Sequence, residues 1–360
     1  MQHVVIYRSN GRYAGWPANY GIWSWGDEIV TGFILGFHYQ DGGTHTVDSE
    51  RPFVAMQARS LDGGLTWDST EAPLLAPGNA GISADEHMSS PQGPVSERSN
   101  APSFHPGGVN FAHPDFALLC ARTGLKSGAE SWFYTSTNRC RSWDGPFALP
   151  MFEQLGVAAR TDYLKYGLDQ PQKATLLLTA TKPDGEEGRV FCARTEDGGG
   201  SFSFVSWLRP TPSGFDIMPA SIKLTSGGIV TAMRSRNSSG TRNWIDLMRS
   251  DDDGQNWRLI STPVPDTGSG GNPPTMIHLP DGRICLIYGY RDRPSGIRAV
   301  LSGDEGQTWT EGIVLRNDGV NHDIGYPRAI QRSDGNVVVA YYYNDSTYGE
   351  RYIAATIWKP

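Results

Sequence analysis

The sequence has no excess of basic residues. Its 360 residues include 31 lysines and arginines and 38 aspartates and glutamates, which gives a net charge of −7. Because proteins bind the phosphates of nucleic acids through positively charged surfaces, this balance argues against a nucleic-acid partner. The sequence also lacks an apolar run of about eighteen residues, the length that crosses a bilayer as a helix, so we expect no membrane insertion.

No secretory leader is recognisable at the start of the sequence. The first residues, MQHVVIYRSNGRYAGW, lack the charged beginning and the apolar stretch that such a leader combines. We therefore expect a soluble protein, which is cytoplasmic as the sequence is written and periplasmic or secreted if a leader has been removed.

Cysteine is scarce, with 4 residues in the chain. Cys120, Cys192 and Cys285 lie in apolar, strand-like stretches at similar places in different repeats, a pattern that favours buried free thiols over disulfides. The cysteines lack the spacing of a zinc or redox motif, so we expect neither a metal nor another cofactor. Three isolated histidines favour surface or turn positions: His87, His105 and His113.

Glycine, proline and aromatic residues are abundant instead. The chain contains 43 glycines, 24 prolines, 11 tryptophans and 15 tyrosines, a composition typical of many short strands joined by turns. One motif recurs, as SLDGGLTW at 60, STNRCRSW at 136, TEDGGGSF at 195, SDDDGQNW at 250 and SGDEGQTW at 302. Its aspartate can accept hydrogen bonds from the following amides, its glycine can take a positive φ, and its tryptophan can pack between repeats. The motif therefore predicts a structural turn between two strands.

A second pattern predicts β-hairpins. HLPDGRICLIYGYRD at 278 and QRSDGNVVVAYYYND at 331 each read as strand, short turn and strand, and such hairpins begin near residues 16, 109, 158, 218, 273 and 326. Together with the turn motif they predict an all-β fold, a six-bladed β-propeller of four-stranded antiparallel sheets, in a single domain over residues 1–360. The last blade lacks one strand, which the amino-terminal MQHVVIYRS is expected to supply. Residues 69–105 form the largest insertion and are expected to lie as a loop over the rim.

The topology of such a propeller divides the side chains between two rims. The start of strand 1, the end of strand 2 and the start of strand 3 share one rim, and the aspartate-containing turns lie on the other, so we expect function on the first rim. Converging arginines there indicate an anionic ligand, and carboxylates with a tyrosine can supply an acid, a base and a nucleophile. The candidate residues on this rim are Trp16, His38, Asp48, Arg160, Glu187, Arg189, Asp216, Arg234, Arg236, Asn272, Arg291, Asp323 and Tyr326.

The S-x-D-x-G-x-x-W turns at 60, 250 and 302, on a chain with six blade-like units, resemble those of the Asp-box (BNR repeat) sialidase, or neuraminidase, superfamily. The resemblance covers nearly all 360 residues and is specific for architecture more than for substrate. It implies an axial pocket with three arginines for a sugar carboxylate, a tyrosine nucleophile paired with a glutamate, and an aspartic acid that acts as acid and base.

The resemblance places several of these roles on particular residues. Tyr326 matches the tyrosine, Arg291 is similar to the arginine before the last Asp box, and Arg234 or Arg236 is similar to the one before that. Asp48 fits the acid best, with Asp41 second.

Two positions depart from the family pattern. Gly15 and Trp16 stand where the first arginine is expected, and Asp216 is the nearest carboxylate to the position of the expected glutamate. The candidates to replace these groups come from the third blade and are Arg160, Glu187 and Arg189.

These assignments imply an exo-acting glycoside hydrolase that cleaves a terminal, anionic or highly hydroxylated sugar from a glycan. Asp48 would protonate the leaving oxygen, and Tyr326 would attack the anomeric carbon after losing its proton to Glu187 or Asp216. A carbohydrate is thus the expected partner, held through its carboxylate by Arg160, Arg234 and Arg291. The remaining rim candidates are expected to contact the sugar: Trp16, His38, Arg189, Arg236, Asn272 and Asp323.

Two alternatives use the same scaffold. A polysaccharide lyase acting on a uronic acid needs an arginine or asparagine to neutralise the carboxylate and a tyrosine or histidine to remove the proton at C5, parts that Tyr326, His38 and His45 could play. A non-catalytic glycan-binding propeller would use aromatic platforms for sugar stacking, for which the candidates are Trp16, Trp23 and Tyr342.

Overall fold

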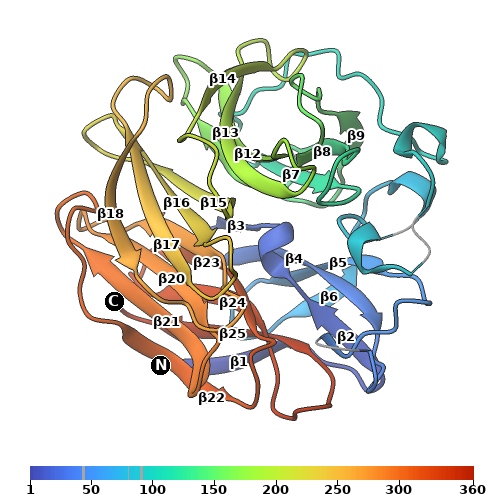
Figure 1. Cartoon of the computed structure of the whole chain (residues 1–360), viewed down its shortest axis with the longest axis vertical. Helices are drawn as coiled ribbons and strands as arrows, with labels where there is room; N and C mark the ends of the chain where they lie inside the picture. Colours follow the sequence, from blue (N-terminus) through green and yellow to red (C-terminus); the bar gives the residue numbers. More distant parts are fainter. Residues whose placement is uncertain (43–44, 80, 90–91) are drawn as a thin grey trace.

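The chain folds as six antiparallel β-sheets arranged around a central axis (Figure 1). The computed structural model describes residues 1–42, 45–79, 81–89 and 92–360. Successive sheets follow one another around the ring in chain order, and each meets its neighbours face to face. The predicted six-bladed propeller is confirmed.

The blades are built from short strands with a few 3-10 helices between them. The first sheet contains β2 (Arg12–Gly15), β3 (Ile22–Trp25), β4 (Glu28–Phe37), β5 (Val54–Ser60) and β6 (Asp68–Glu71), and the second contains β7 (Ala117–Arg122), β8 (Ser131–Ser136) and β9 (Asp144–Ala148). The third contains β10 (Val157–Ala158), β11 (Tyr163–Lys165), β12 (Ala174–Thr181), β13 (Glu187–Thr195) and β14 (Ser203–Trp207), and the fourth contains β15 (Phe215–Lys223), β16 (Ile229–Arg236), β17 (Asn243–Ser250) and β18 (Arg258–Val264). The fifth contains β19 (Pro274–His278), β20 (Ile284–Tyr290), β21 (Ser295–Ser302) and β22 (Ile313–Gly319). The 3-10 helices within the described ranges include η1 (Pro17–Asn19), η3 (Pro77–Asn79), η4 (Asp85–His87) and η5 (Val95–Glu97).

The sixth sheet joins the two ends of the chain. It contains β23 (Gly325–Gln331), β24 (Val337–Tyr343), β25 (Tyr352–Trp358) and β1 (Gln2–Tyr7). β1 pairs antiparallel with β25 over a register that runs from Gln2 opposite Ile357 to Tyr7 opposite Ile353. The amino-terminal strand is thus the outermost strand of the last blade, and its pairing closes the ring.

The second blade differs from its prediction. The hairpin expected near residue 109 is absent from the described part of this sheet, which has three strands, β7 to β9. In place of a first strand, Asn110 accepts the backbone N–H of Ala112 through its side chain (3.0 Å), and His113 accepts that of Asp115 (3.2 Å). These local turns occupy amides that a strand would present to its neighbour, so residues 109–116 form turns.

The aspartate-containing turns have the predicted construction. In the first, the Oγ of Ser60 accepts the backbone N–H of Gly64 (2.8 Å), and Asp62 accepts the amides of Leu65 and Thr66 (3.0 and 2.9 Å). The tryptophan also joins neighbouring blades, as predicted: Nε1 of Trp257 donates to the Oγ of Ser206 in β14 (3.0 Å). A similar bond, of 3.1 Å, joins Trp309 to Ser261 in β18.

The cores between blades are apolar and contain the cysteines. All four cysteines are buried free thiols, which confirms the prediction made for Cys120, Cys192 and Cys285. Cys140 stands at the glycine position of its turn and takes a φ of 59°, the left-handed conformation for which glycine is usually used. Among the described residues, no helix is long and apolar enough to cross a membrane.

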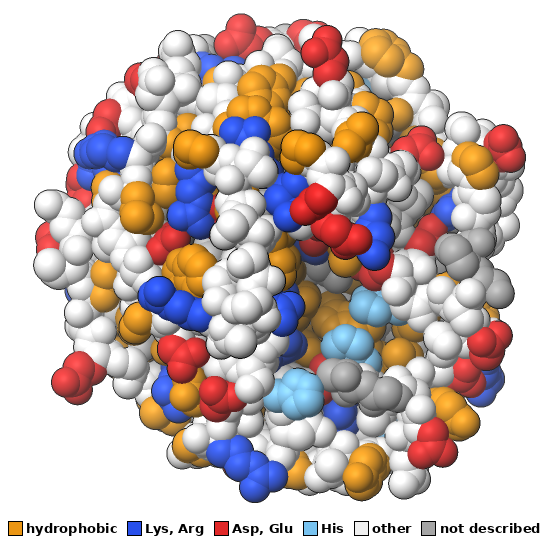
Figure 2. Space-filling model, in the orientation of Figure 1, with side chains coloured by type: hydrophobic (Ala, Val, Ile, Leu, Met, Phe, Trp, Pro, Cys, Tyr) orange, Lys and Arg blue, Asp and Glu red, His pale blue; other side chains and the backbone are white. Residues whose placement is uncertain are grey.

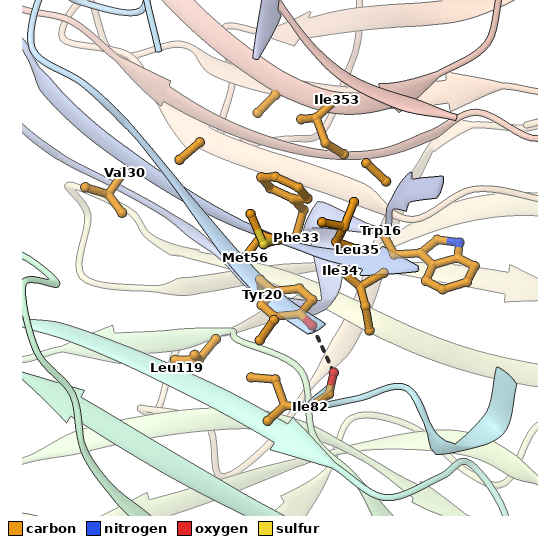
Figure 3. Close-up of a cluster of buried hydrophobic side chains, with 14 of the residues drawn as sticks. Trp16, Tyr20, Val30, Phe33, Ile34, Leu35, Met56, Ile82, Leu119 and Ile353 are labelled. Atoms are coloured by element: carbon orange, nitrogen blue, oxygen red, sulfur yellow. Dashed lines mark hydrogen bonds between the residues drawn. The ribbon is translucent and has the colours of Figure 1, made fainter. Parts of the chain in front are cut away.

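The insertion is tied to the first blade. Figure 3 shows Tyr20, from the segment between η1 and β3, with its hydroxyl directed at the carbonyl oxygen of Ile82 (2.9 Å). Ile82 packs in the same apolar cluster as Phe33 and Trp16, and all three are almost fully buried. These contacts fix the insertion beside the residues that begin the first blade.

Candidate active site

Three of the predicted residues meet at one rim. Tyr326 is the second residue of β23, Arg234 lies near the end of β16, and Arg291 follows directly after β20. In an antiparallel blade, the start of strand 1 and the end of strand 2 lie at the same rim, so residues from three blades converge near the axis. The aspartate-containing turns connect strands 3 and 4 and therefore lie at the opposite rim.

The phenol of Tyr326 is surrounded by arginines. Nη1 of Arg234 donates a hydrogen bond of 3.2 Å to its oxygen, and the guanidinium of Arg291 lies 5.6 Å from the centre of its ring. Burial raises the pKa of the Tyr326 hydroxyl, but the positive charges of Arg234, Arg291 and Arg160 outweigh this effect and lower it below its ordinary value. A lowered pKa makes the phenolate easier to form, as a nucleophile or base requires.

The backbone of Tyr326 takes an unusual conformation. Its φ is 50°, and Trp16 and Met218, at the corresponding positions of the first and fourth blades, have φ values of 53° and 52°. Each of the three directly precedes a proline, which disfavours the right-handed helical conformation at these positions. Met218 and Tyr326 pack in one cluster. Strained backbone of this kind is concentrated at functional sites, where the surrounding structure holds it in place.

Arg160 and Glu187 form a buried ion pair beside this centre. The two side chains are 5% and 8% exposed, and both guanidinium Nη atoms donate to the carboxylate. Arg160 lies close enough to Tyr326 to lower the pKa of its hydroxyl. Glu187 makes its side-chain hydrogen bonds to Arg160 and makes none to Tyr326 among the described residues.

The insertion contributes a second buried ion pair. Arg122, the last residue of β7, is 1% exposed and donates from Nη2 to Glu86 of η4. Nε and Nη1 of Arg122 and Oε2 of Glu86 are buried without a hydrogen-bond partner in the described part of the chain. The two pairs interact electrostatically, because Glu187 acts on Arg122 and Glu86 acts on Arg160.

Asp323 holds a network on the other side of Tyr326. The carboxylate is fully buried and accepts hydrogen bonds from Nδ1 of His45, the hydroxyl of Tyr342 and Nε of Arg351, at 2.7, 2.7 and 2.8 Å. Nη2 of Arg291 donates to the same Tyr342 hydroxyl (2.9 Å), which links the network to the arginines around Tyr326. Burial raises the pKa of Asp323, but His45 and the arginines lower it well below its ordinary value, so the carboxylate is ionised.

A cavity of about 650 Å³ opens beside this network. Figure 2 shows histidine side chains gathered along a hollow on this face of the molecule. The ring of His87 stacks on Trp16 at 3.9 Å with an interplanar angle of 14°, and the ring of His45 stands edge-on to Trp16 at 5.1 Å. The residues that line the cavity are Tyr39, Asp41, Gly42, His45, Val47, Asp48, Ser49, Glu50 and His87.

Four predicted rim residues make their contacts elsewhere. Arg189 stacks over Trp207 at 3.9 Å, and Arg236 donates to the carbonyl oxygen of Gly240 within its own hairpin loop. The carboxylate of Asp216 accepts hydrogen bonds from Nε and Nη2 of Arg209 and from the hydroxyl of Ser235 (2.7 Å). His38 contacts the carbonyl oxygen of Thr46 through Nδ1 (3.1 Å). The described contacts join none of the four to Tyr326.

Two further candidates support the site from inside the fold. Asn272 is fully buried and accepts the backbone N–H of Tyr326 (3.0 Å) while it donates to the carbonyl oxygen of Ile324 (2.9 Å). It therefore fixes the start of β23, which carries Tyr326. Trp16 is 2% exposed and lies under His87 and His45, so it sets the positions of these rings.

The aromatic platforms proposed for a glycan-binding propeller are wrong. Trp16, Trp23 and Tyr342 are 2%, 8% and 0% exposed, so a sugar ring cannot stack on their faces. Each packs in the interior, and the hydroxyl of Tyr342 is bound to Asp323.

Comparison with protein-family models matches residues 113–339 to the BNR repeat-like domain, which is more than half of the chain. The chain belongs to this family. Comparison with the curated proteins gives no match.

Among solved structures, the BNR repeat-like chain is similar to a Dyadobacter fermentans protein described as of unknown function. The identity is 22%, the match covers 99% of this chain and 97% of that chain, and the TM-score is 0.73. A mutant of the NanB sialidase from Streptococcus pneumoniae matches at 14% identity over 99% and 70% of the two chains, with a TM-score of 0.63. The intramolecular trans-sialidase from Ruminococcus gnavus matches at 10% identity over 94% of each chain, with a TM-score of 0.62. At these identities the likeness shows a sialidase-like propeller fold.

The structure adds residues to the site of this BNR repeat-like protein that the sequence did not reveal. His87 ends the 3-10 turn η4, which agrees with the surface or turn position predicted for it, and its ring, 21% exposed, also packs against Trp16 and lines the cavity. The turn positions predicted for His105 and His113 are confirmed, because each accepts a backbone amide two residues ahead. Glu86 and Arg351 lacked any local signal, since their roles depend on Arg122 and Asp323 from distant parts of the chain. The described residues contain no group of three metal-ligating side chains.

Proposed function

We propose that the protein is an exo-acting glycoside hydrolase that removes a terminal anionic sugar from a glycan. The observation that carries this proposal is the phenol of Tyr326, which accepts a hydrogen bond from Arg234 and lies in the field of Arg291 and Arg160. A tyrosine in this setting can attack an anomeric carbon that bears a carboxylate. Its phenol approaches an anionic substrate with less repulsion than an aspartate or glutamate would.

The arginines supply the anion-binding part of the site. Nη1 of Arg291 makes no hydrogen bond among the described residues, while its Nε and Nη2 are held by the carbonyl oxygen of Ile324 and by Tyr342. Such a guanidinium is positioned by the protein and retains a free donor for a ligand carboxylate. Arg234 is fixed in the same way by the carbonyl oxygen of Gly270.

The base and the acid come from different blades in this proposal. Glu187 binds Arg160, whose charge acts on the Tyr326 hydroxyl, whereas Asp216 is bound to Arg209, so Glu187 is the better candidate to influence the proton of the phenol. The proton donor belongs to residues 38–51, where the family resemblance predicts Asp48, and Asp48 lines the cavity beside His45.

A screen for released sugar tests the proposal. Purified protein is incubated with sialosides, uronides and arabinosides, and free reducing sugar is measured against a Tyr326→Phe variant prepared in parallel. We expect wild-type protein to release the terminal sugar from one acidic class and the variant to release none. Absence of release from every class, or equal release by the variant, would contradict the proposal.

A uronic-acid lyase is the second candidate, and the lowered pKa of the Tyr326 hydroxyl is the observation that favours it. A phenolate beside arginines can remove the proton at C5 of a uronic acid whose carboxylate those arginines neutralise. Such a reaction creates a carbon–carbon double bond next to the carboxylate. Ultraviolet absorbance of the uronide products therefore separates the lyase from the hydrolase.

A further inference from the structure

His45 is held by a buried carboxylate and faces the cavity. Its Nδ1 lies 2.7 Å from Oδ1 of Asp323, whose side chain is fully buried, while the side chain of His45 is 31% exposed. Because Asp323 is ionised, Nδ1 must carry the proton of this hydrogen bond. Nε2 is then the ring nitrogen without a proton in neutral His45, and it makes no hydrogen bond among the described residues.

Two neighbouring aromatic rings also hold the orientation of the His45 ring. Trp16 contacts it edge-on at 5.1 Å, and His87 lies at 5.7 Å with an interplanar angle of 85°. Asp323 itself is held by Tyr342 and Arg351, so the carboxylate cannot turn away from the imidazole. A histidine whose tautomer and orientation are set in this way is arranged for proton transfer at its free nitrogen.

The imidazole belongs to the same network as the tyrosine. Tyr342 accepts a hydrogen bond from Arg291 and donates one to Asp323, and its ring stands edge-on to that of Tyr326 at 5.9 Å. Asp48 lines the same cavity, but its carboxylate accepts the backbone N–H of Glu50 (3.0 Å) within its own loop. Asp323, by contrast, is a buried carboxylate that orients the imidazole of His45.

We propose that His45, oriented by Asp323, is the residue that transfers protons to and from the leaving group, in place of Asp48. The proposal rests on the proposed hydrolase function and names a further catalytic residue for it. The first step starts from the imidazolium form of His45 and the phenolate of Tyr326: the anomeric carbon–oxygen bond breaks, the leaving oxygen takes the proton from Nε2 of His45, and the phenolate oxygen bonds to the anomeric carbon. In the second step Nε2 takes a proton from water, the water oxygen bonds to the anomeric carbon, and the bond to Tyr326 breaks to restore the phenolate.

Other titratable groups surround this histidine. His87 and His322 interact with it electrostatically, Arg351 and Arg291 act on it through Asp323, and three carboxyl side chains line the same cavity: Asp41, Asp48 and Glu50. A pH profile alone would therefore not identify the proton donor, and the test needs a readout specific to His45.

Nuclear magnetic resonance tests the geometry without a substrate. In protein labelled with ¹⁵N-histidine, and with His45→Gln to assign its signals, we expect neutral His45 to carry its proton on Nδ1. Asp323→Asn should weaken this preference for the Nδ1 proton, because an amide oxygen is a weaker acceptor than the carboxylate 2.7 Å from Nδ1. Tyr342→Phe, which leaves Asp323 in place with one donor fewer, should preserve the Nδ1 tautomer. A proton on Nε2 in the wild type, or an unchanged tautomer ratio in Asp323→Asn, would overturn the inference.

Leaving-group dependence tests the catalytic role. On the methyl glycoside of the sugar identified by the screen, His45→Gln should lower kcat by about 10²- to 10⁴-fold, the usual contribution of an acid catalyst. On the 4-nitrophenyl glycoside, whose leaving group needs no proton, the glycosylation step should be nearly unchanged. Tyr326→Phe should be inactive on both substrates, which separates failure of this inference from failure of the proposed function. If Asp48→Asn shows the leaving-group dependence and His45→Gln does not, Asp48 is the acid and the inference is wrong.

Discussion

Nη1 of Arg234 donates a hydrogen bond of 3.2 Å to the phenol oxygen of Tyr326, although the two residues are 92 positions apart in the chain. They come from the fourth and the sixth blade. The bond exists because the end of β16 and the start of β23 lie at the same rim and near the same axis. It holds the permanent positive charge of Arg234 next to the Tyr326 hydroxyl, the group proposed to be the nucleophile.

Loss of that charge should make Tyr326 harder to ionise. In Arg234→Met we expect the pKa of the Tyr326 hydroxyl to rise, because burial already raises it and one of the opposing charges is removed. Tyrosinate absorbance, followed against pH and compared with Tyr326→Phe, measures the shift. Arg236→Met is the control, since Arg236 contacts Gly240 and should leave the titration unchanged. Equal titrations of Arg234→Met and wild type would contradict the arrangement.

The buried ion pair of the third blade gives a prediction about stability with a neighbouring control. Glu187→Gln leaves Arg160 charged and unpaired at 5% exposure, and we expect it to lower the free energy of unfolding by about 3–5 kcal/mol. Glu186→Gln removes an ion pair at the surface, in which the side chains of Lys126 and Glu186 are 71% and 56% exposed. This change should lower the free energy of unfolding by about 0–1 kcal/mol. Urea unfolding measures both. Similar losses in the two variants would show that Arg160 is solvated or has another partner.

His87 should make stability depend on pH. Burial lowers the pKa of this histidine to about 4, whereas it is 6.5 ordinarily, so between these values the unfolded chain binds a proton that the folded chain does not. The free energy of unfolding should therefore fall as the pH falls from 6.5 to 4, by up to about 3 kcal/mol from this group. His87→Phe preserves an aromatic ring over Trp16 and should lack this component. The difference between variant and wild type, measured by urea unfolding at several pH values, should change across this window in favour of the variant at low pH. A constant difference would count against a partly buried His87 that stays neutral in the folded protein.

The turns at the opposite rim should affect folding and leave catalysis intact. Ser250→Ala removes the acceptor of the Gly254 amide (2.8 Å), and the buried, unsatisfied N–H should cost about 1–3 kcal/mol. Because this turn lies away from Tyr326, kcat should remain at the wild-type value at a temperature where both proteins are folded. Thermal unfolding and the sugar-release assay measure the two effects. A loss of kcat with unchanged stability would contradict the division between the rims.

The sequence predicted those features that depend on local chemistry and on strand order. The turns follow from serine, aspartate and glycine at fixed spacing, since their hydrogen bonds are made within the motif itself. The meeting of Tyr326, Arg234 and Arg291 follows from counting strands, because the topology alone brings these positions to one rim.

Other residues depended on contacts that no local pattern encodes. Arg234 and Arg236 are two positions apart on one strand, but Arg236 lies where the following loop begins and donates to the carbonyl oxygen of Gly240 in that loop. Asp216 is taken by Arg209 from the irregular segment between β14 and β15. Glu86 and His87 come from an insertion without strand periodicity, whose path is set by its packing on the first blade.

The most direct test of the account is the rate of sugar release by Tyr326→Phe. Circular dichroism and thermal unfolding would first show that the variant is folded, as expected for a change that removes one oxygen atom at the rim. With the substrate class found by the screen, we predict release at least 10³-fold slower than that of the wild type, the order expected when a catalytic nucleophile is lost. Release at the wild-type rate would contradict the claim that the arginines and this tyrosine form the catalytic centre.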